Sequence, residues 1–310
     1  MGMTRTFHCQ VSRRGFFSVS LLGAAGVALA ACSSGSSDSD ASSAAASSSG
    51  DAQAPRRVVA LNTGQLDTLL ALGVVPVGIA TATTGVPEFL QEEFGQRHDL
   101  SGIEVVGERS DPSVEKIAAL EPDLILANQR ADSGLLERLR ALAPVVLSNG
   151  GSEKWKEDLG IIADAVGQRA EADRLLDDYE KEAQDWAQQR GSGGTVSLVR
   201  SKGQQYLMHG EHSLAGIVAR DAGFTRPDSQ TFNDKPNREV SPENFHELEA
   251  GYLFYSFSGP AAEITDNALW SNLTVVKDGH AQEVDGDPWF LNSSIVAAQW
   301  VLADMKKAVK

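Results

Sequence analysis

The chain has 310 residues, of which 42% are hydrophobic and 22% are charged, so it can bury a sizeable core, and its length suggests two domains of ordinary size. Its 42 acidic residues outnumber its 27 Lys and Arg residues, which gives a formal net charge of −15. This balance argues against a general nucleic-acid binder, because such a protein needs a basic face for the phosphates. The two cysteines are too few for a disulfide framework or for a zinc or iron–sulfur site built from several cysteines.

The N-terminus has the pattern of an export signal. Arg13 and Arg14 form a basic pair, and residues 16–31 are an uncharged, mostly apolar run. This run is shorter than a membrane span of about 20 residues. The pair resembles a twin-arginine signal, and the letters LAAC ending at Cys32 resemble a bacterial lipobox, in which the cysteine sulfur is lipidated. We therefore predict a twin-arginine lipoprotein signal peptide over residues 1–31, the alternative being a plain secretory signal with an incidental cysteine.

Residues 32–54 are expected to be a flexible tether. Positions 33–54 contain ten Ser and six Ala and no large apolar side chain. Such a segment cannot bury enough surface to offset the entropy lost on ordering. Signal and tether together predict an extracytoplasmic protein that is anchored to the cell membrane by a lipid on Cys32.

From residue 55 onward, short apolar runs alternate with helical stretches. Strands are expected at 57–61, 75–79, 104–106, 123–127 and 145–147, and helices at 65–72, 112–120 and 132–142. Continuous apolar strands that alternate with helices indicate a parallel sheet covered on both faces. Residues 55–160 are therefore predicted to form an N-terminal α/β lobe.

A long helix is expected next, followed by a second α/β lobe. Residues 168–190 contain neither Pro nor Gly and predict one helix of about 34 Å at 1.5 Å per residue. We assign 161–194 to the connecting helix and its linker, and 195–310 to the second lobe. Its strands are expected at 195–199, 205–208 and 252–257, and its helices at 213–222, 242–249 and 292–309. The predicted fold is α/β, with two Rossmann-like lobes joined by one long helix and a ligand cleft between them, near the carboxyl ends of the strands.

Signatures of catalysis are missing from the sequence. It contains no G-x-S-x-G elbow, no phosphate-binding G-x-x-x-x-G-K-[ST] loop and no H-E-x-x-H, so we predict that the chain is not an enzyme. His209 and His212 are three apart and could share a metal ion, but no acidic cluster accompanies them. We favour ordinary loop roles for this pair and predict no metal site. Haem ligation by a histidine, or by Tyr206 or Tyr255, stays open.

Several segments resemble the iron–siderophore group of bacterial ABC-transporter binding proteins. The most specific is VGERSDPSVEKI at 106–117, which is similar to the G-x-R-x-x-P-S-x-E-x-I motif of that group and continues into ALEPDLI at 119–125. Weaker similarities lie at 57–78, 240–243 and 269–279. The resemblance covers residues 55–310 and implies two lobes joined by a single helix.

The resemblance also implies a function. A protein of this group captures a ferric siderophore outside the cell and passes it to an ABC importer. Because the siderophore fills the coordination sphere of iron, the protein needs no cofactor or metal ligands of its own, and uses cations and aromatic faces instead. The expected ligand-binding residues are Arg109, Arg130, Arg238, Tyr255, Phe257, Trp289 and Phe290.

Some of these expectations have named alternatives. Arg109 matches the motif arginine that contacts the siderophore in this group, although it could instead form a surface ion pair with Glu108 or Asp111. Glu115 and Glu243 match glutamates that form salt bridges to the two permease subunits, although a carboxylate in a first helical turn can also be an ordinary cap. We expect a monomer, and the alternative function is haem binding for a haem importer.

Overall fold

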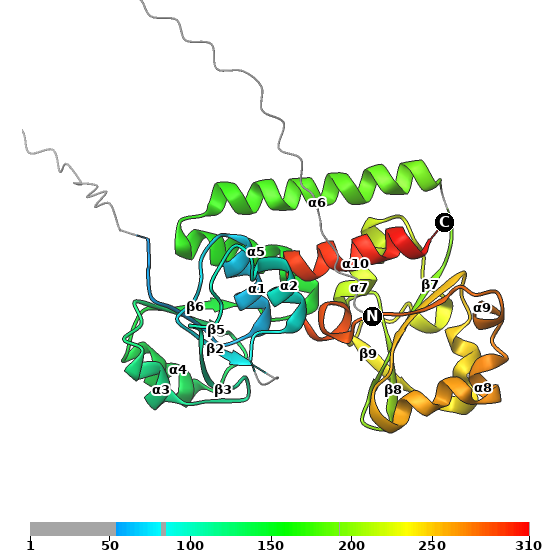
Figure 1. Ribbon diagram of the computed structural model, residues 1–310, viewed down its shortest axis with the longest axis horizontal. Coiled ribbons are helices and arrows are strands. Elements are labelled where there is room, and N and C mark those ends of the chain that lie inside the picture. Colours follow the sequence, from blue (N-terminus) through cyan, green and yellow to red (C-terminus); the bar gives the residue numbers. More distant parts are fainter. Residues whose placement is uncertain (1–53, 82–84, 192, 310) are drawn as a thin grey trace, which may run out of the picture. The chain divides into compact units, whose positions relative to one another are not determined.

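The computed structural model describes residues 54–81, 85–191 and 193–309 (Figure 1). These residues belong to one compact unit, 52–310, which contains both sheets of the protein. The signal peptide at 1–31 and almost the whole tether at 32–54, including Cys32, lie outside the described residues. Within the described part of the chain, no helix combines the length and the apolar character that crossing a bilayer requires.

The first sheet has the strand order β4-β3-β2-β1-β5-β6. Its strands are β1 (Val58–Ala60), β2 (Gly78–Thr81), β3 (Glu104–Glu108), β4 (Asp111–Pro112), β5 (Leu124–Asn128) and β6 (Val145–Ser148). All neighbouring strands are parallel except β3 and β4. From β1, the sheet extends on one side through β2 and on the other side through β5. The carboxyl edge beside β1 and β5 is therefore the switch point at which doubly wound sheets bind ligands.

Helices cover both faces of the first sheet, as predicted. Val58 and Ala60 pack against helices on one face, and Val59 packs against helices on the other. The first face carries α1 (Thr63–Ala71), α2 (Glu88–Phe94) and α5 (Trp155–Val166), and the second carries α3 (Val114–Ala119) and α4 (Ser133–Arg140). Three of these helices begin at a side chain that accepts a hydrogen bond from a first-turn N–H, namely Asn62, Ser113 and Asp132.

The long helix predicted at 168–190 is α6 (Arg169–Arg190). It packs against α5 beside the first sheet and against α7 (Leu214–Asp221) beside the second (Figure 1). Trp155 of α5 meets Tyr179 of α6 edge to face at 5.4 Å, and the Tyr179 hydroxyl donates a hydrogen bond to Asp221 of α7. Lys156 forms an ion pair with the same carboxylate at 2.9 Å, so this group of contacts links helices from both halves of the unit.

The second sheet has the order β11-β10-β7-β8-β9. Its strands are β7 (Val196–Lys202), β8 (Gln205–His209), β9 (Asn237–Val240), β10 (Tyr252–Ser256) and β11 (Ala281–Glu283). β7, β10 and β11 are parallel, whereas β8 is antiparallel to both β7 and β9. The sheet is mixed because only two residues connect β7 to β8, and a connection that short joins antiparallel strands only.

The second half also contains short irregular helices. The segment predicted as a helix at 242–249 is a 3-10 helix, η3 (Pro242–Leu248), and the C-terminal helix α10 (Ile295–Ala308) begins later than expected because Ser294 caps it. The other short elements are η1 (Ser152–Lys154), η2 (Asp228–Gln230), η4 (Gly259–Asp266), α8 (Ala268–Ser271), α9 (Thr274–Lys277) and a π-helix, η5 (Asp287–Leu291).

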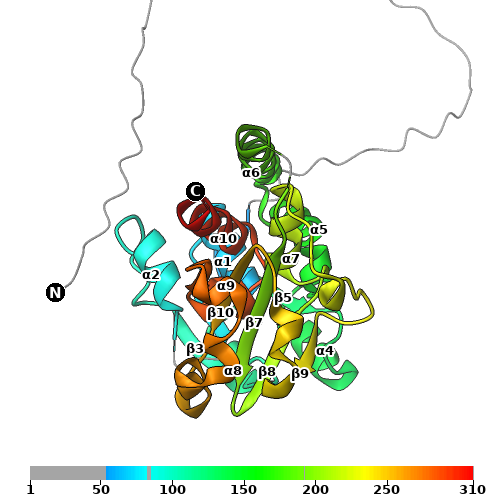
Figure 2. The ribbon, with the colours of Figure 1, turned by 90° about the vertical axis from the view of Figure 1, so that its right-hand side faces the viewer.

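The C-terminal helix lies where the two sheets' helices meet. α10 contacts α1 and α5 from the first half and α7 from the second, and α6 packs on it as well. Figures 1 and 2 both place α6, α7 and α10 together and α8 at the opposite end of the second sheet. The predicted α/β fold with two lobes is therefore confirmed.

Candidate functional site

A cavity of about 180 Å³ lies at the carboxyl edge of the first sheet. Its walls come from the start of α1 and the residue before it, from the β3–β4 hairpin, from the segment that follows β6, from α5, and from η5 with the segment after it. We call it the first cavity. Its lining residues are Asn62, Gly64, Gln65, Thr68, Arg109, Ser148, Gly150, Gly151, Ser152, Asp158, Ile162, Phe290, Leu291 and Ser293.

Arg109 reaches the first cavity from the tip of a tight hairpin. Glu108 of β3 pairs with Asp111 of β4, which leaves only Arg109 and Ser110 between the strands. The hairpin needs a glycine before it, because Gly107 has φ +128° and a Cβ there would lie 2.9 Å from the Asp111 carbonyl oxygen. Among the described residues, Arg109 has no hydrogen bond or ion pair. Its guanidinium is therefore neutralised by neither Glu108 nor Asp111, and it is available to a ligand.

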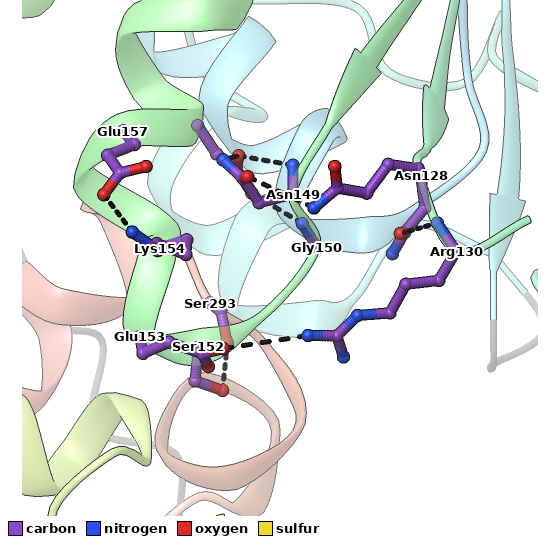
Figure 3. A network of polar contacts seen from close by, with 11 residues as sticks. Asn128, Arg130, Asn149, Gly150, Ser152, Glu153, Lys154, Glu157 and Ser293 are labelled. Atoms are coloured by element: carbon purple, nitrogen blue, oxygen red, sulfur yellow. Dashed lines mark hydrogen bonds and ion pairs between the residues drawn. The ribbon is translucent and has the colours of Figure 1, made fainter.

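The loop after β6 is held in place by α5. The Asp158 carboxylate accepts hydrogen bonds from the backbone N–H of Asn149 at 2.7 Å and of Gly150 at 2.9 Å. On the other side of the cavity, the hydroxyls of Ser152 and Ser293 lie 2.9 Å apart and join η1 to the segment before α10 (Figure 3). The wall of the first cavity is thus fixed by hydrogen bonds before any ligand enters.

Arg130 lies on the same edge as the first cavity but does not line it. Figure 3 shows its side chain extended from the end of β5 toward Ser152 and Glu153. Its Nη2 is 3.7 Å from the Glu153 carboxylate, and the two side chains are 65% and 41% exposed. Exposed ion pairs of this kind contribute little, so an anionic ligand could replace Glu153 at small cost.

A second cavity, of about 470 Å³, lies at the carboxyl ends of β7, β10 and β11. Its lining residues are Arg200, Ser201, Lys202, Ser256, Ser258, Asp285, Gly286, Asp287 and Leu291. Leu291, the last residue of the π-helix η5, lines both cavities, and its side chain is 45% exposed. The cavities at the two carboxyl edges are therefore both bordered by η5, as expected for a cleft between two lobes.

The second cavity contains charges of both signs. Arg200 is half-buried, and burial lowers the pKa of its guanidinium. Its Nη1 donates to the Ser201 carbonyl oxygen at 3.1 Å, and its buried Nε has no partner among the described residues. On the η5 side, burial and the neighbouring Asp285 raise the pKa of Asp287. Lys202 is exposed and has no carboxylate partner in the described structure.

The sequence of the chain also matches a known protein family. A model described as "Periplasmic binding protein" matches residues 58–288, which include every strand of both sheets. The chain belongs to this family. The resemblance read from the sequence is confirmed, and with it the prediction of a binding protein in place of an enzyme.

Curated relatives of this periplasmic binding protein include iron-chelate binders. It is 31% identical over 271 residues to the probable siderophore-binding lipoprotein YfiY of Bacillus subtilis, covering 81% of this chain and 82% of YfiY. It is 29% identical to the Fe(3+) dicitrate-binding periplasmic protein FecB of Escherichia coli, covering 82% and 85% of the two chains. Among solved structures, SirA of Staphylococcus aureus superposes with a TM-score of 0.70 at 26% identity, covering 82% of this chain and 98% of SirA.

In this periplasmic binding protein, most of the aromatic residues expected at the ligand lie in the core. Trp289 is 0% exposed, stacks on Phe254 at 4.7 Å and donates from Nε1 to Asp304, so it has no free face for a ligand. Phe257 is buried, and Tyr255 packs with it around Trp270. Of the four, only Phe290 lines either of these two cavities, and its ring lies 4.7 Å from that of His209.

Arg238 also lies away from the two cavities. It sits on the edge strand β9, where it forms an ion pair with Asp234 at 2.8 Å and lies over the ring of Phe232 at 4.4 Å. Arg238 is paired with Met208 of β8, so both side chains lie on the same face of the sheet. Met208 belongs to the core on the face away from α10. The sequence does not reveal the face on which Arg238 lies, because the pattern of residues in this edge strand is compatible with either face.

The described histidines do not gather with other potential ligands. His209 is buried, and burial followed by the nearby Arg200 and Arg226 lowers the pKa of its imidazole to about 3. Among the described residues there is no group of three or more His, Cys, Asp or Glu that could hold a metal ion. Neither cavity is lined by a described His, Tyr, Cys or Met, so the haem alternative has no axial ligand there.

The two glutamates matched to permease docking are both exposed. Glu115 lies in the first turn of α3, and hydrogen bonds from its own backbone N–H and from the Ser113 hydroxyl lower the pKa of its carboxyl group. Glu243 follows Pro242 in η3 and lines a shallow groove beside Leu269, whose side chain is 43% exposed. Each carboxylate is thus accessible to a partner from solvent.

Two residues of the site were not found from the sequence. Arg200 and Lys202 belong to the last part of β7, beyond the 195–199 strand that the apolar run indicates. The run TVSLVRSK at 195–202 is followed by a glycine, and this pattern could have extended the predicted strand as far as Lys202.

Proposed function

We propose that this chain is an extracytoplasmic lipoprotein, anchored to the cell membrane, that captures ferric siderophores and delivers them to an ABC importer. The observation that carries the proposal is the unpaired guanidinium of Arg109, held at a hairpin tip on the first cavity, at the carboxyl edge of the first sheet. The names of YfiY, a probable siderophore-binding lipoprotein, and of FecB, a ferric dicitrate-binding protein, support the same conclusion.

The chemistry of the two cavities suits a ligand that brings its own iron ligands. A ferric siderophore presents oxygen atoms and apolar groups, so its carrier needs cations, hydroxyl donors and some apolar surface. Arg109 supplies the cation in the first cavity, with Arg130 beside it at the rim. Phe290 and Leu291 supply apolar surface between the two edges.

Export and anchoring complete the proposal at the N-terminus. Arg13 and Arg14 direct export, and Cys32 receives the lipid after removal of residues 1–31. In this proposal residues 32–54 link the lipid anchor to the binding unit. The protein works as a monomer in this scheme.

Docking to the importer uses one glutamate from each half of the unit. Glu115 lies on α3 beside the first sheet, and Glu243 lies on η3 beside the second. Their exposed carboxylates form salt bridges to arginines of the two permease subunits. Binding at two separate points lets the importer hold both lobes at once.

The test is the affinity of the purified protein for a ferric siderophore, measured by quenching of Trp fluorescence. Arg109→Ala should weaken binding by about 1.5–3 kcal/mol, the range for hydrogen bonds to charged groups, which raises Kd by roughly ten- to hundred-fold. Arg140→Ala removes the same charge from an exposed position on α4 that lines neither cavity, and should leave Kd unchanged. Equal affinities for all three proteins would refute the assignment of Arg109.

A further inference from the structure

Three cations without carboxylate partners converge on the two cavities. Arg109 lines the first, Arg200 and Lys202 line the second, and Leu291 lies between them. The structure gives none of the three an ion pair with a described carboxylate, although the chain carries a net charge of −15. Burying part of a guanidinium without a counter-ion is costly. Arg200 is half-buried with an unpartnered Nε, so its surroundings suit a negatively charged ligand.

Serine residues line both cavities together with these cations. The first cavity is lined by Ser148, Ser152 and Ser293, and the second by Ser201, Ser256 and Ser258. Hydroxyls donate short hydrogen bonds to carboxylate oxygens. Carboxylates are small and compact, and can be bound singly by one cation and one or two hydroxyls.

Aromatic surface is scarce in the same cavities. Phe290 is the only described aromatic residue that lines either of them, and its ring already packs against His209. Catechol rings of a tricatecholate need flat apolar faces to cover them. A ferric trihydroxamate carries no net negative charge at iron, so it would leave Arg200 and Lys202 without partners.

We propose that the ligand is a ferric chelate of the hydroxycarboxylate type, such as ferric citrate, and that Arg200 and Lys202 bind the half of it opposite Arg109. This inference rests on the proposed function and names its substrate class. The acidic residues Asp285 and Asp287 line the second cavity from the η5 side. Because like charges repel, these two residues favour binding of the ligand's carboxylates on the β7 side, beside the two cations.

The experiment titrates the purified full chain with three probes and follows Trp fluorescence. The probes are ferric citrate, ferrioxamine B as the hydroxamate, and ferric enterobactin as the tricatecholate. Ferric citrate should bind with a Kd at least ten-fold below those of the other two. Preferred binding of the hydroxamate or the tricatecholate would overturn this inference and leave the proposed function standing, whereas binding of none of them would contradict both.

Variants then test the second cavity. Arg200→Gln and Lys202→Gln should each raise the Kd for ferric citrate by about ten-fold or more, and Lys277→Gln, at an exposed position on α9 outside both cavities, should not change it. Because Arg200 is half-buried, its variant could fail to fold. Lys202 is exposed, so its variant decides the matter: an unchanged Kd for folded Lys202→Gln would overturn the assignment.

Discussion

Asp67 should make the stability of this protein decrease as pH rises. Its side chain on α1 is 0% exposed; Oδ2 accepts a hydrogen bond from the Ser294 hydroxyl at 2.9 Å, and Oδ1 has no partner among the described residues. Burial raises the pKa of this carboxyl group from 3.8 to about 8, and the charge of Asp287 acts in the same direction. Between these two values the folded chain holds a proton that the unfolded chain has released. The free energy of unfolding therefore falls as pH rises through this window, and is constant above it.

The size of the effect follows from the width of that window. One pKa unit corresponds to about 1.4 kcal/mol, so the interval from pH 5 to pH 8 contributes at most about 4 kcal/mol. Local relaxation and water entry reduce this to about 2 kcal/mol. Asp67→Asn keeps the shape of the side chain and an oxygen that accepts from Ser294, but it cannot ionise. The variant should therefore gain about 2 kcal/mol over the wild type between pH 5 and pH 8.

Urea denaturation at the two pH values measures this difference. Glu92→Gln, which removes an exposed carboxylate on α2, is the control and should follow the wild type at both pH values. If wild type and Asp67→Asn lost stability equally between pH 5 and pH 8, Asp67 would be ionised at both, and the argument from burial would be refuted.

Three further predictions concern the binding cycle and the hairpin. Glu115→Ala combined with Glu243→Ala should leave the affinity for the ferric siderophore intact and abolish uptake of iron-labelled siderophore by cells; normal uptake would return both residues to the role of helix caps. Cys32→Ala should move the protein from the membrane fraction to the medium or periplasm on immunoblots, and a variant that stays in the membrane would contradict the lipid anchor. Gly107→Ala should lower the free energy of unfolding by about 1–3 kcal/mol because of its positive φ, and should weaken ligand binding by displacing Arg109; a thermal melt and a titration check both.

The sequence predicts the buried elements of this fold better than its edges. The run at 123–127 becomes β5 one residue further along, because a strand buried on both faces is apolar throughout. Three of the four edge strands, namely β9, β11 and the two-residue β4, carry polar residues and leave no such pattern, whereas the apolar edge strand β6 was predicted. Helix α5 was missed although its apolar residues have helical spacing, whereas the π-helix η5 leaves no signal in its sequence.

The candidate site shows the same limit for single side chains. Arg109 could be predicted because a motif with a glycine and a proline fixes the hairpin that carries it. Trp289 and Phe290 are adjacent in the sequence, yet one is buried in the core and the other lines a cavity. Which of two neighbours faces a ligand depends on the packing of η5 against Phe254, a contact between segments far apart in the chain.

The most direct test of the account is a crystal structure of the purified protein with a ferric siderophore bound. We expect the iron complex to lie between Arg109 and Arg200, in contact with Leu291, so that it bridges the carboxyl edges of the two sheets. A complex bound outside both cavities at saturating ligand, with Arg109 and Arg200 making no contact to it, would contradict the central claim.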